Sequence, residues 1–280
     1  GDIAIIAGKG HETTQDYNGK KRYFSDRKEI LKSILKKNRS LFKDLRLNII
    51  QEKTKILPKN INFNKACIDS KEIKKNDIFF AIKGKNNDGN KFIAQAFSKK
   101  ASLAIVNKIN KKNNIKHQIK IKDTLKFLTE NSKIFRENIN TKIIAITGSC
   151  GKTTLKELLG SLLKKVSTVS ISPKSYNNKY GVPLSLFNLN QKDNYGVLEL
   201  GMDKKGEIDY LSKIVQPDVS VITNINYAHA KNFKNLKQIA LAKSEIINNT
   251  KDNGFIILNA DDNFFTLHKK IAKKKNLKIL

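Results

Sequence analysis

From residue 141 onward, short apolar runs alternate with stretches of helical periodicity. The runs predict buried strands, and apolar positions spaced by three and four residues predict the helices between them. Continuous apolar strands separated by helices are typical of an α/β fold with a parallel sheet covered on both faces, whose ligands bind at the carboxyl ends of the strands. The expected strands are 142–147, 166–171, 195–200, 219–223 and 255–259, and the expected helices are 152–165, 206–214, 236–249 and 262–274.

The pattern before residue 141 is less regular and predicts two further segments. Residues 1–34 hold an apolar run and then a helical stretch, and a lysine-rich link at 35–40 separates them from a mixed α/β segment at 41–140. The expected elements are strands at 3–7, 77–82 and 103–106, helices at 25–35 and 92–99, and a turn at 84–89.

The composition adds limits on location. No run approaches the roughly 20 apolar residues of a membrane helix, and the chain does not open with a signal-peptide pattern. Two cysteines, Cys67 and Cys150, are too few for a disulfide framework. We therefore expect a cytoplasmic protein that is not inserted in a membrane.

The charge is strongly positive, at +30, and would ordinarily suggest nucleic acid as a partner. Proteins that recognise bases and phosphates specifically favour arginine and cluster it on one face of the molecule. Here 50 lysines and only five arginines are scattered along the whole chain. We expect no nucleic-acid partner, although a basic P-loop protein that binds nucleic acid stays the alternative from a different functional class.

A glycine-rich loop follows the first expected strand of the third segment. A glycine loop that opens a helix turns backbone N–H groups onto phosphate oxygens, its lysine reaches the terminal phosphates, and a hydroxyl ligates Mg²⁺. The usual pattern has a glycine where Ile146 stands, so the loop is a shortened form; a simple glycine turn is the alternative. The candidate nucleotide-binding residues are Gly148, Ser149, Cys150, Gly151, Lys152, Thr153 and Thr154.

Two polar residues follow the ends of other expected strands. Glu199 closes an apolar strand, where a carboxylate is costly unless a cation accompanies it; a carboxylate that simply reaches solvent is the alternative. His229 lies in the loop after the strand at 219–223, and from position alone a surface histidine is an equal possibility.

Lys243 stands in the apolar stripe of the helix at 236–249. A buried ammonium either loses its proton or finds an anion, and a neutral amine can react with carbon dioxide to give a carbamate, which is a metal ligand. A lysine whose head extends to solvent is the alternative. We expect every other lysine of the chain to be solvated.

Several spaced motifs together resemble the Mur ligase family. The earlier segment also resembles the family's substrate domain, although Lys71 and Asn90 stand where the family pattern often has arginine and histidine. The matching segments are 69–71, 77–84, 88–89, 92–93, 147–154, 177–184, 199–201, 206–208, 223–224 with His229, 242–246 and 259–262.

The resemblance implies a substrate-binding domain at 41–140 and a P-loop ATP-binding central domain at 141–280 that is incomplete, without the family's Rossmann-like third domain. Residues 1–34 resemble the last part of another ligase of the family, through 7–12 and 24–27, so we expect a piece of a fused two-enzyme polypeptide that is inactive alone. Another Mur or folylpolyglutamate-type ligase is the alternative within the superfamily.

The resemblance further implies an ATP-dependent amide ligation through an acyl phosphate, in which D-alanyl-D-alanine is joined to UDP-N-acetylmuramoyl-tripeptide. ATP and Mg²⁺ are the implied cofactors. Thr153 and Glu199 would hold one Mg²⁺, and His229 with carbamylated Lys243 the second. The implied catalytic residues are Lys152, Glu199, His229 and Lys243; further nucleotide-binding residues are Asn177, Asn178 and Asn259; substrate-binding residues are Ser70, Lys71, Gly84 and Asp88.

Overall fold

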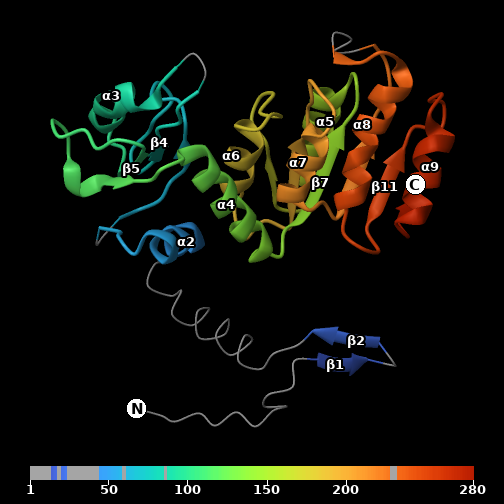
Figure 1. Ribbon diagram of the computed structural model, residues 1–280, viewed down its shortest axis with the longest axis horizontal. Coiled ribbons are helices and arrows are strands. Elements are labelled where there is room, and N and C mark those ends of the chain that lie inside the picture. The colour runs from blue at the N-terminus through green and yellow to red at the C-terminus, as the bar shows by residue number, and fades with distance from the viewer. Residues whose placement is uncertain (1–13, 18–19, 24–43, 59–60, 85–86, 228–231) are drawn as a thin grey trace.

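The computed structural model describes residues 14–17, 20–23, 44–58, 61–84, 87–227 and 232–280 (Figure 1). The first two ranges are the antiparallel strands β1 (Thr14–Tyr17) and β2 (Lys20–Tyr23). The strand expected at 3–7, the helix at 25–35 and the link at 35–40 lie outside the described residues.

A six-stranded sheet forms the larger half of the described chain, with the strand order β12-β11-β10-β7-β9-β8. All of its neighbouring strands are parallel, as the continuous apolar runs predicted. The strands are β7 (Lys142–Thr147), β8 (Val169–Ile171), β9 (Tyr195–Glu199), β10 (Val219–Ile222), β11 (Phe255–Leu258) and β12 (Lys278–Ile279).

Helices cover both faces of this sheet because successive residues of each strand point to opposite sides. On β7, Ile144 and Ile146 face the leucines of α5, while Ile143 and Ala145 face a core shared with the other helices. The helices are α5 (Lys152–Lys164), α6 (Gly181–Phe187), α7 (Glu207–Val215), α8 (Leu236–Asn249) and α9 (Phe265–Lys274). No described helix has the length and apolar character needed to cross a membrane.

A second, four-stranded parallel sheet has the order β3-β4-β5-β6. The helix α3 covers one of its faces, and α2 and α4 lie on the other. Its elements are α2 (Leu45–Thr54), β3 (Ala66–Cys67), β4 (Ile78–Phe80), the 3-10 turn η2 (Gly89–Phe92), α3 (Ile93–Ser98), β5 (Leu103–Val106), the 3-10 turn η3 (Ile115–His117), β6 (Gln118–Lys120) and α4 (Thr124–Glu137).

The two sheets share one hydrophobic core, and α4 lies between them (Figure 1). Phe187, at the end of α6, makes edge-on contacts with Phe63, Phe80 and Phe135, at ring-centroid distances of 6.0, 6.2 and 5.9 Å. The side-chain amide of Asn188 also pairs with the edge strand β3, donating to the Ala66 carbonyl at 2.8 Å and accepting from its N–H at 2.7 Å. The division of the chain at residue 140 stays a prediction, because α4 packs on both halves.

The α/β fold with parallel sheets is confirmed, but several boundaries differ from those expected. The strand expected from residue 166 begins at Val169, since Val166 is 81% exposed. The helix expected from residue 262 begins at Phe265, because the Asp262 carboxylate accepts from the backbone N–H groups of Ile225 and Phe264 and so belongs to a loop. The helices α2, α4 and α6 and the strands β1, β2, β3, β6 and β12 were not predicted.

Candidate functional site

The loop between β7 and α5 depends on two glycines. Gly148 has a φ of 147°, and a Cβ there would lie 1.9 Å from the Oγ1 of Thr223. Gly151 is the N-cap residue of α5 with a φ of 78°, and no atom lies within 4 Å of where its Cβ would be. The first turn of a helix has N–H groups with no acceptor inside the helix. The loop therefore presents the start of α5 to open space, as a phosphate requires.

Residues that follow β10 hold this loop in place. The Ser149 N–H donates to the Asn224 carbonyl at 2.9 Å, and the Cys150 N–H donates to the Asn224 side-chain oxygen at 3.0 Å. The Thr223 hydroxyl donates to the Cys150 carbonyl at 2.7 Å. Because β7 and β10 are parallel neighbours, their carboxyl ends meet here, where the strand pattern placed the ligand site.

Two lysines converge on this loop from different helices. The Nζ of Lys152, from α5, donates to the Gly148 carbonyl at 2.9 Å and to that of Ser149 at 3.2 Å. The Nζ of Lys243, from α8, donates to the same Gly148 oxygen at 2.9 Å. Lys243 is only 2% exposed, so its predicted burial is confirmed. Burial, and then the charge of Lys152, lower the pKa of Lys243 to about 7.

A buried carboxylate lies beside the phosphate loop. Glu199, at the end of β9, is 2% exposed and accepts from the Thr153 hydroxyl and from the Asn177 amide, each at 2.7 Å. Among the described residues no cation pairs with it. A hydroxyl and a carboxylate are oxygen ligands of the kind that Mg²⁺ prefers, and Mg²⁺ ordinarily takes one or two carboxylates beside phosphate and water. Thr153 and Glu199 therefore fit a Mg²⁺ ion, and the loop with Lys152 fits a nucleotide phosphate.

The other nucleotide-site candidates have different surroundings. Asn178 accepts from the N–H groups of Tyr180 and Gly181, each at 3.0 Å, and so holds the start of α6. Thr154 is exposed on the first turn of α5, and Asn259 is exposed after β11, where its side chain accepts from the Asp261 N–H. His229 lies outside the described residues. Among those described, no cluster of three or more His, Cys, Asp or Glu could hold a metal.

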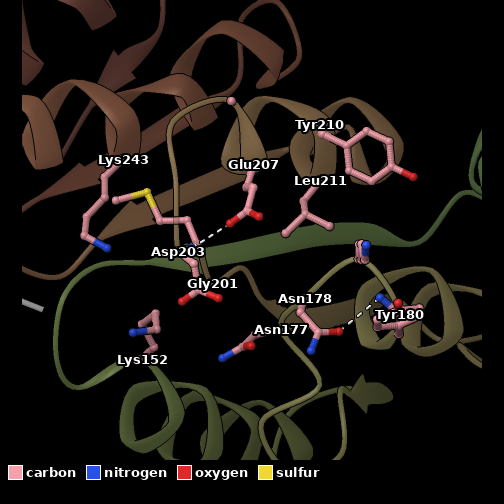
Figure 2. A pocket seen from close by; sticks show the side chains of 13 residues that line it. Lys152, Asn177, Asn178, Tyr180, Gly201, Asp203, Glu207, Tyr210, Leu211 and Lys243 are labelled. Carbon is pink, nitrogen blue, oxygen red and sulfur yellow. Dashed lines mark hydrogen bonds between the residues drawn. The ribbon is translucent and has the colours of Figure 1, made fainter. Parts of the chain in front are cut away.

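A cavity of about 530 Å³ opens beside these groups (Figure 2). Lys152, Lys243, Asn177 and Asn178 line it, and Figure 2 shows Asp203, Glu207 and Tyr210 along its other wall. The sequence indicated no role for these three residues beyond the resemblance at 206–208, because only the fold of 201–206 brings them near Lys152. The remaining lining residues are Lys179, Tyr180, Gly201, Met202, Gly206 and Leu211.

The carboxylate of Glu245 fixes the wall of this cavity from α8. It accepts from the Gly206 N–H at 2.9 Å and from the Asp209 N–H at 3.0 Å, so it caps the start of α7. Glu245 stands two residues after Lys243, and the same helix therefore supplies a site amine and a support for the facing wall. Glu245 lies in the matching segment 242–246, but the sequence indicated no role for it.

A second cavity, of about 540 Å³, lies between the four-stranded sheet and the loop before α6. Ser70 and Lys71 line it, together with Phe92, Tyr176 and Tyr180. Gly84 and Asp88 do not line it. The Gly84 N–H donates to the Asn87 carbonyl, and the Asp88 carboxylate caps η2, so these two residues shape the neighbouring loop. Asn178 and Tyr180 line both cavities, which are therefore adjacent.

Known proteins resemble this chain. Residues 146–280 match the model of the Mur ligase middle domain. These residues belong to the Mur ligase family, and the family predicted from the motifs is confirmed.

Two curated relatives carry the same name. The chain is 40% identical over 214 residues to the UDP-N-acetylmuramoyl-tripeptide–D-alanyl-D-alanine ligase of Buchnera aphidicola subsp. Acyrthosiphon pisum, covering 76% of this chain and 47% of the relative. It is 36% identical to the ligase of that name from Haemophilus influenzae, over 75% of this chain and 47% of the relative. The chain thus spans about half the length of the curated relatives it matches.

Solved structures give the same result. A crystal structure of MurF from Acinetobacter baumannii matches with a TM-score of 0.73 and 35% identity, covering 84% of this chain and 52% of that one. MurF ligase from Thermotoga maritima in complex with ADP matches with a TM-score of 0.66 and 31% identity, covering 80% and 51%.

Proposed function

We propose that this chain supplies the nucleotide-binding and substrate-binding parts of an ATP-dependent ligase that joins D-alanyl-D-alanine to UDP-N-acetylmuramoyl-tripeptide in the cytoplasm. The observation that carries the proposal is the convergence of Lys152, Lys243, Thr153 and Glu199 on one phosphate loop. The names of the relatives support the choice of substrates.

The phosphate loop and its neighbours bind the nucleotide in this proposal. The N–H groups at the start of α5 and the Lys152 ammonium neutralise the β- and γ-phosphates, and Thr153 with Glu199 holds the Mg²⁺. When bound, MgATP supplies the phosphoryl group that activates the tripeptide carboxylate. Lys152 changes partners on binding, because its present acceptors are only carbonyl oxygens of the loop itself.

Lys243 has a separate role. Its lowered pKa of about 7 leaves a large fraction of the amine neutral at neutral pH. A neutral amine adds to carbon dioxide and releases one proton, giving a carbamate. We assign this carbamate, with His229, to a second Mg²⁺. The nearby charge of Lys152 would stabilise the added negative charge.

The two adjacent cavities divide the substrate between them. Ser70 and Lys71 offer a hydroxyl and a cation to the UDP group, and the aromatic rings of Phe92 and Tyr176 line the same cavity. The peptide end then reaches the first cavity past Asn178 and Tyr180, where its carboxylate meets Lys152. Asn259 approaches the adenine from the end of β11.

A product assay tests this function. The natural polypeptide in which the chain occurs is incubated with MgATP, UDP-N-acetylmuramoyl-tripeptide and D-alanyl-D-alanine, and the pentapeptide product is followed by mass spectrometry. We expect product with the native protein and none with Lys152→Ala. Absence of product from a folded native protein that binds ATP would overturn the assignment of the reaction.

A further inference from the structure

Lys156 is fully buried, although the sequence pattern predicted that every lysine except Lys243 is solvated. Its side chain is 0% exposed on the second turn of α5, one turn after Lys152. The Nζ donates to the backbone carbonyl of Lys174 and lies 3.2 Å from the carboxylate of Glu157, which is itself 58% exposed. The mechanism proposed above makes no use of this ammonium.

The acceptor of Lys156 belongs to a strained turn. The Tyr176 N–H donates to the Pro173 carbonyl at 3.2 Å, which closes a four-residue turn with Lys174 at its second position. Lys174 has a φ of 48°, a left-handed conformation that costs about 1 kcal/mol or more in a residue other than glycine. Such a conformation persists only where contacts hold it, and the buried ammonium of Lys156 provides one.

The residue that follows this turn contacts the proposed Mg²⁺ site. Three residues after Lys174, the carbonyl of Asn177 accepts from the Gly201 N–H at 2.7 Å, and its side-chain amide donates to Glu199. Gly201 allows this approach, because a Cβ there would lie 2.8 Å from the Asn177 side chain. The orientation of the Glu199 carboxylate therefore depends on where this turn places Asn177.

The far side of the turn is held more weakly. The Lys174 ammonium pairs with Glu72 of the four-stranded half at 2.7 Å, but the two side chains are 71% and 46% exposed. Exposed ion pairs contribute little to stability, whereas a hydrogen bond from a buried charge contributes more. Lys156 thus holds Lys174 more firmly than Glu72 does.

We infer that Lys156 is a positioning residue for the Mg²⁺ site. Through the turn at 173–177 it sets the Asn177 amide, and through that amide it orients Glu199 toward Thr153. This inference rests on the proposed function, because it assumes that Thr153 and Glu199 hold Mg²⁺ with a nucleotide. Residues that orient a metal ligand typically change metal affinity by about 10- to 100-fold when they are removed.

The test measures how much Mg²⁺ strengthens nucleotide binding. The dissociation constant of ADP is determined by calorimetry for this chain with saturating Mg²⁺ and again in EDTA, and the ratio is the Mg²⁺ enhancement. For Lys156→Met we expect an unchanged affinity in EDTA and an enhancement reduced about 10-fold. Lys174→Ala is the matched control: it removes the partner of Glu72 but keeps the carbonyl that Lys156 contacts, so we expect the native enhancement.

A second variant guards against a folding defect. Lys156→Gln ends one atom short of the ammonium and cannot reach the Lys174 carbonyl, so we expect the same reduced enhancement. A native enhancement in either folded Lys156 variant, or an equal loss in Lys174→Ala, would overturn the inference. The proposed function fails separately, if the native chain does not bind ADP under either condition.

Discussion

Lys152 and Lys243 donate hydrogen bonds to the same oxygen, the carbonyl of Gly148, each at a distance of 2.9 Å. One lysine comes from the helix that starts at the phosphate loop and the other from α8, more than 90 residues later in the chain. A carbonyl oxygen compensates a cationic group only weakly, so the Lys152 ammonium is ready for an anionic ligand, while burial beside it lowers the pKa of Lys243 to about 7. Both amines line the 530 Å³ cavity.

The buried amine of Lys243 predicts a pH-dependent stability. Its pKa is 10.5 in the unfolded chain and about 7 in the folded protein, so between these values the unfolded state binds the additional proton. Stability must then rise with pH across this window, by at most about 1.4 kcal/mol per pH unit, and the penalty for burying the charge is fully present below pH 7.

We expect Lys243→Met to be more stable than the native protein at pH 6, and this advantage to shrink by about 2 kcal/mol between pH 7.5 and 9. Urea unfolding at several pH values measures the difference. Lys164→Met, at an exposed position of α5, is the control and should show no such trend. A difference between native and Lys243→Met that is the same at every pH contradicts the prediction.

Asp218 joins α4 to the six-stranded sheet and should be important for stability. Its carboxylate accepts from the buried Arg136 guanidinium at 2.7 Å and from the Ile143 N–H at 2.8 Å. Burial alone would raise the pKa of Asp218, but the Ile143 hydrogen bond and the charges of Arg136 and Lys251 lower it below its usual value. The stability from this ionised group is therefore present above the ordinary aspartate pKa and is lost as the pH falls through the lowered one.

Asp218→Asn leaves Arg136, which is 2% exposed, without its buried partner charge. We expect a loss of about 3 kcal/mol in the free energy of unfolding at pH 7. Asp252→Asn is the control, because Asp252 pairs with Lys275 while its own side chain is 83% exposed, and should lose less than about 1 kcal/mol. Equal losses in the two variants would show that the buried pair has no special role.

The two glycines of the phosphate loop should differ in their response to alanine. At Gly148 a Cβ would overlap Thr223, whereas at Gly151 it would meet only open space. Gly148→Ala should weaken ADP binding by at least ~10-fold, since the loop must move and ~1.4 kcal/mol already gives that factor. For Gly151→Ala the only cost is the backbone strain of the positive φ, about 1 kcal/mol. Calorimetry of ADP binding to both variants measures the difference. A smaller loss of ADP affinity in Gly148→Ala than in Gly151→Ala would contradict the loop geometry.

The phosphate loop and the strands β7, β9 and β10 were predictable because their signals are local. The apolar runs of β7, β9 and β10 and the glycine positions of 148–151 lie within a few residues of one another. The helix α6 gave no such signal: all seven of its residues are buried, so its sequence has no polar face, and Pro183 lies inside it. The strands β3 and β6 are too short to show alternation.

The residues that the sequence pattern did not identify owe their positions to tertiary contacts. Lys243 could be identified because its own helix stripe is apolar, but Lys156 is buried by the turn at 173–177, which comes from elsewhere in the chain. The cavity-lining residues Asp203, Glu207 and Tyr210 likewise lie near Lys152 only because of the path that the chain takes after β9. The helix α4 is different, since Asp123 caps it and its apolar positions repeat at helical spacing, and both signals lie in its own sequence.

The central claim is that this loop binds a nucleotide phosphate through Lys152, and calorimetry of ADP with Mg²⁺ tests it most directly. The native chain should bind ADP, and Lys152→Ala should bind it about 10- to 100-fold more weakly, since a hydrogen bond to a charged group contributes ~1.5–3 kcal/mol. Binding of equal strength in both proteins, or no binding by the folded native chain, would contradict the account.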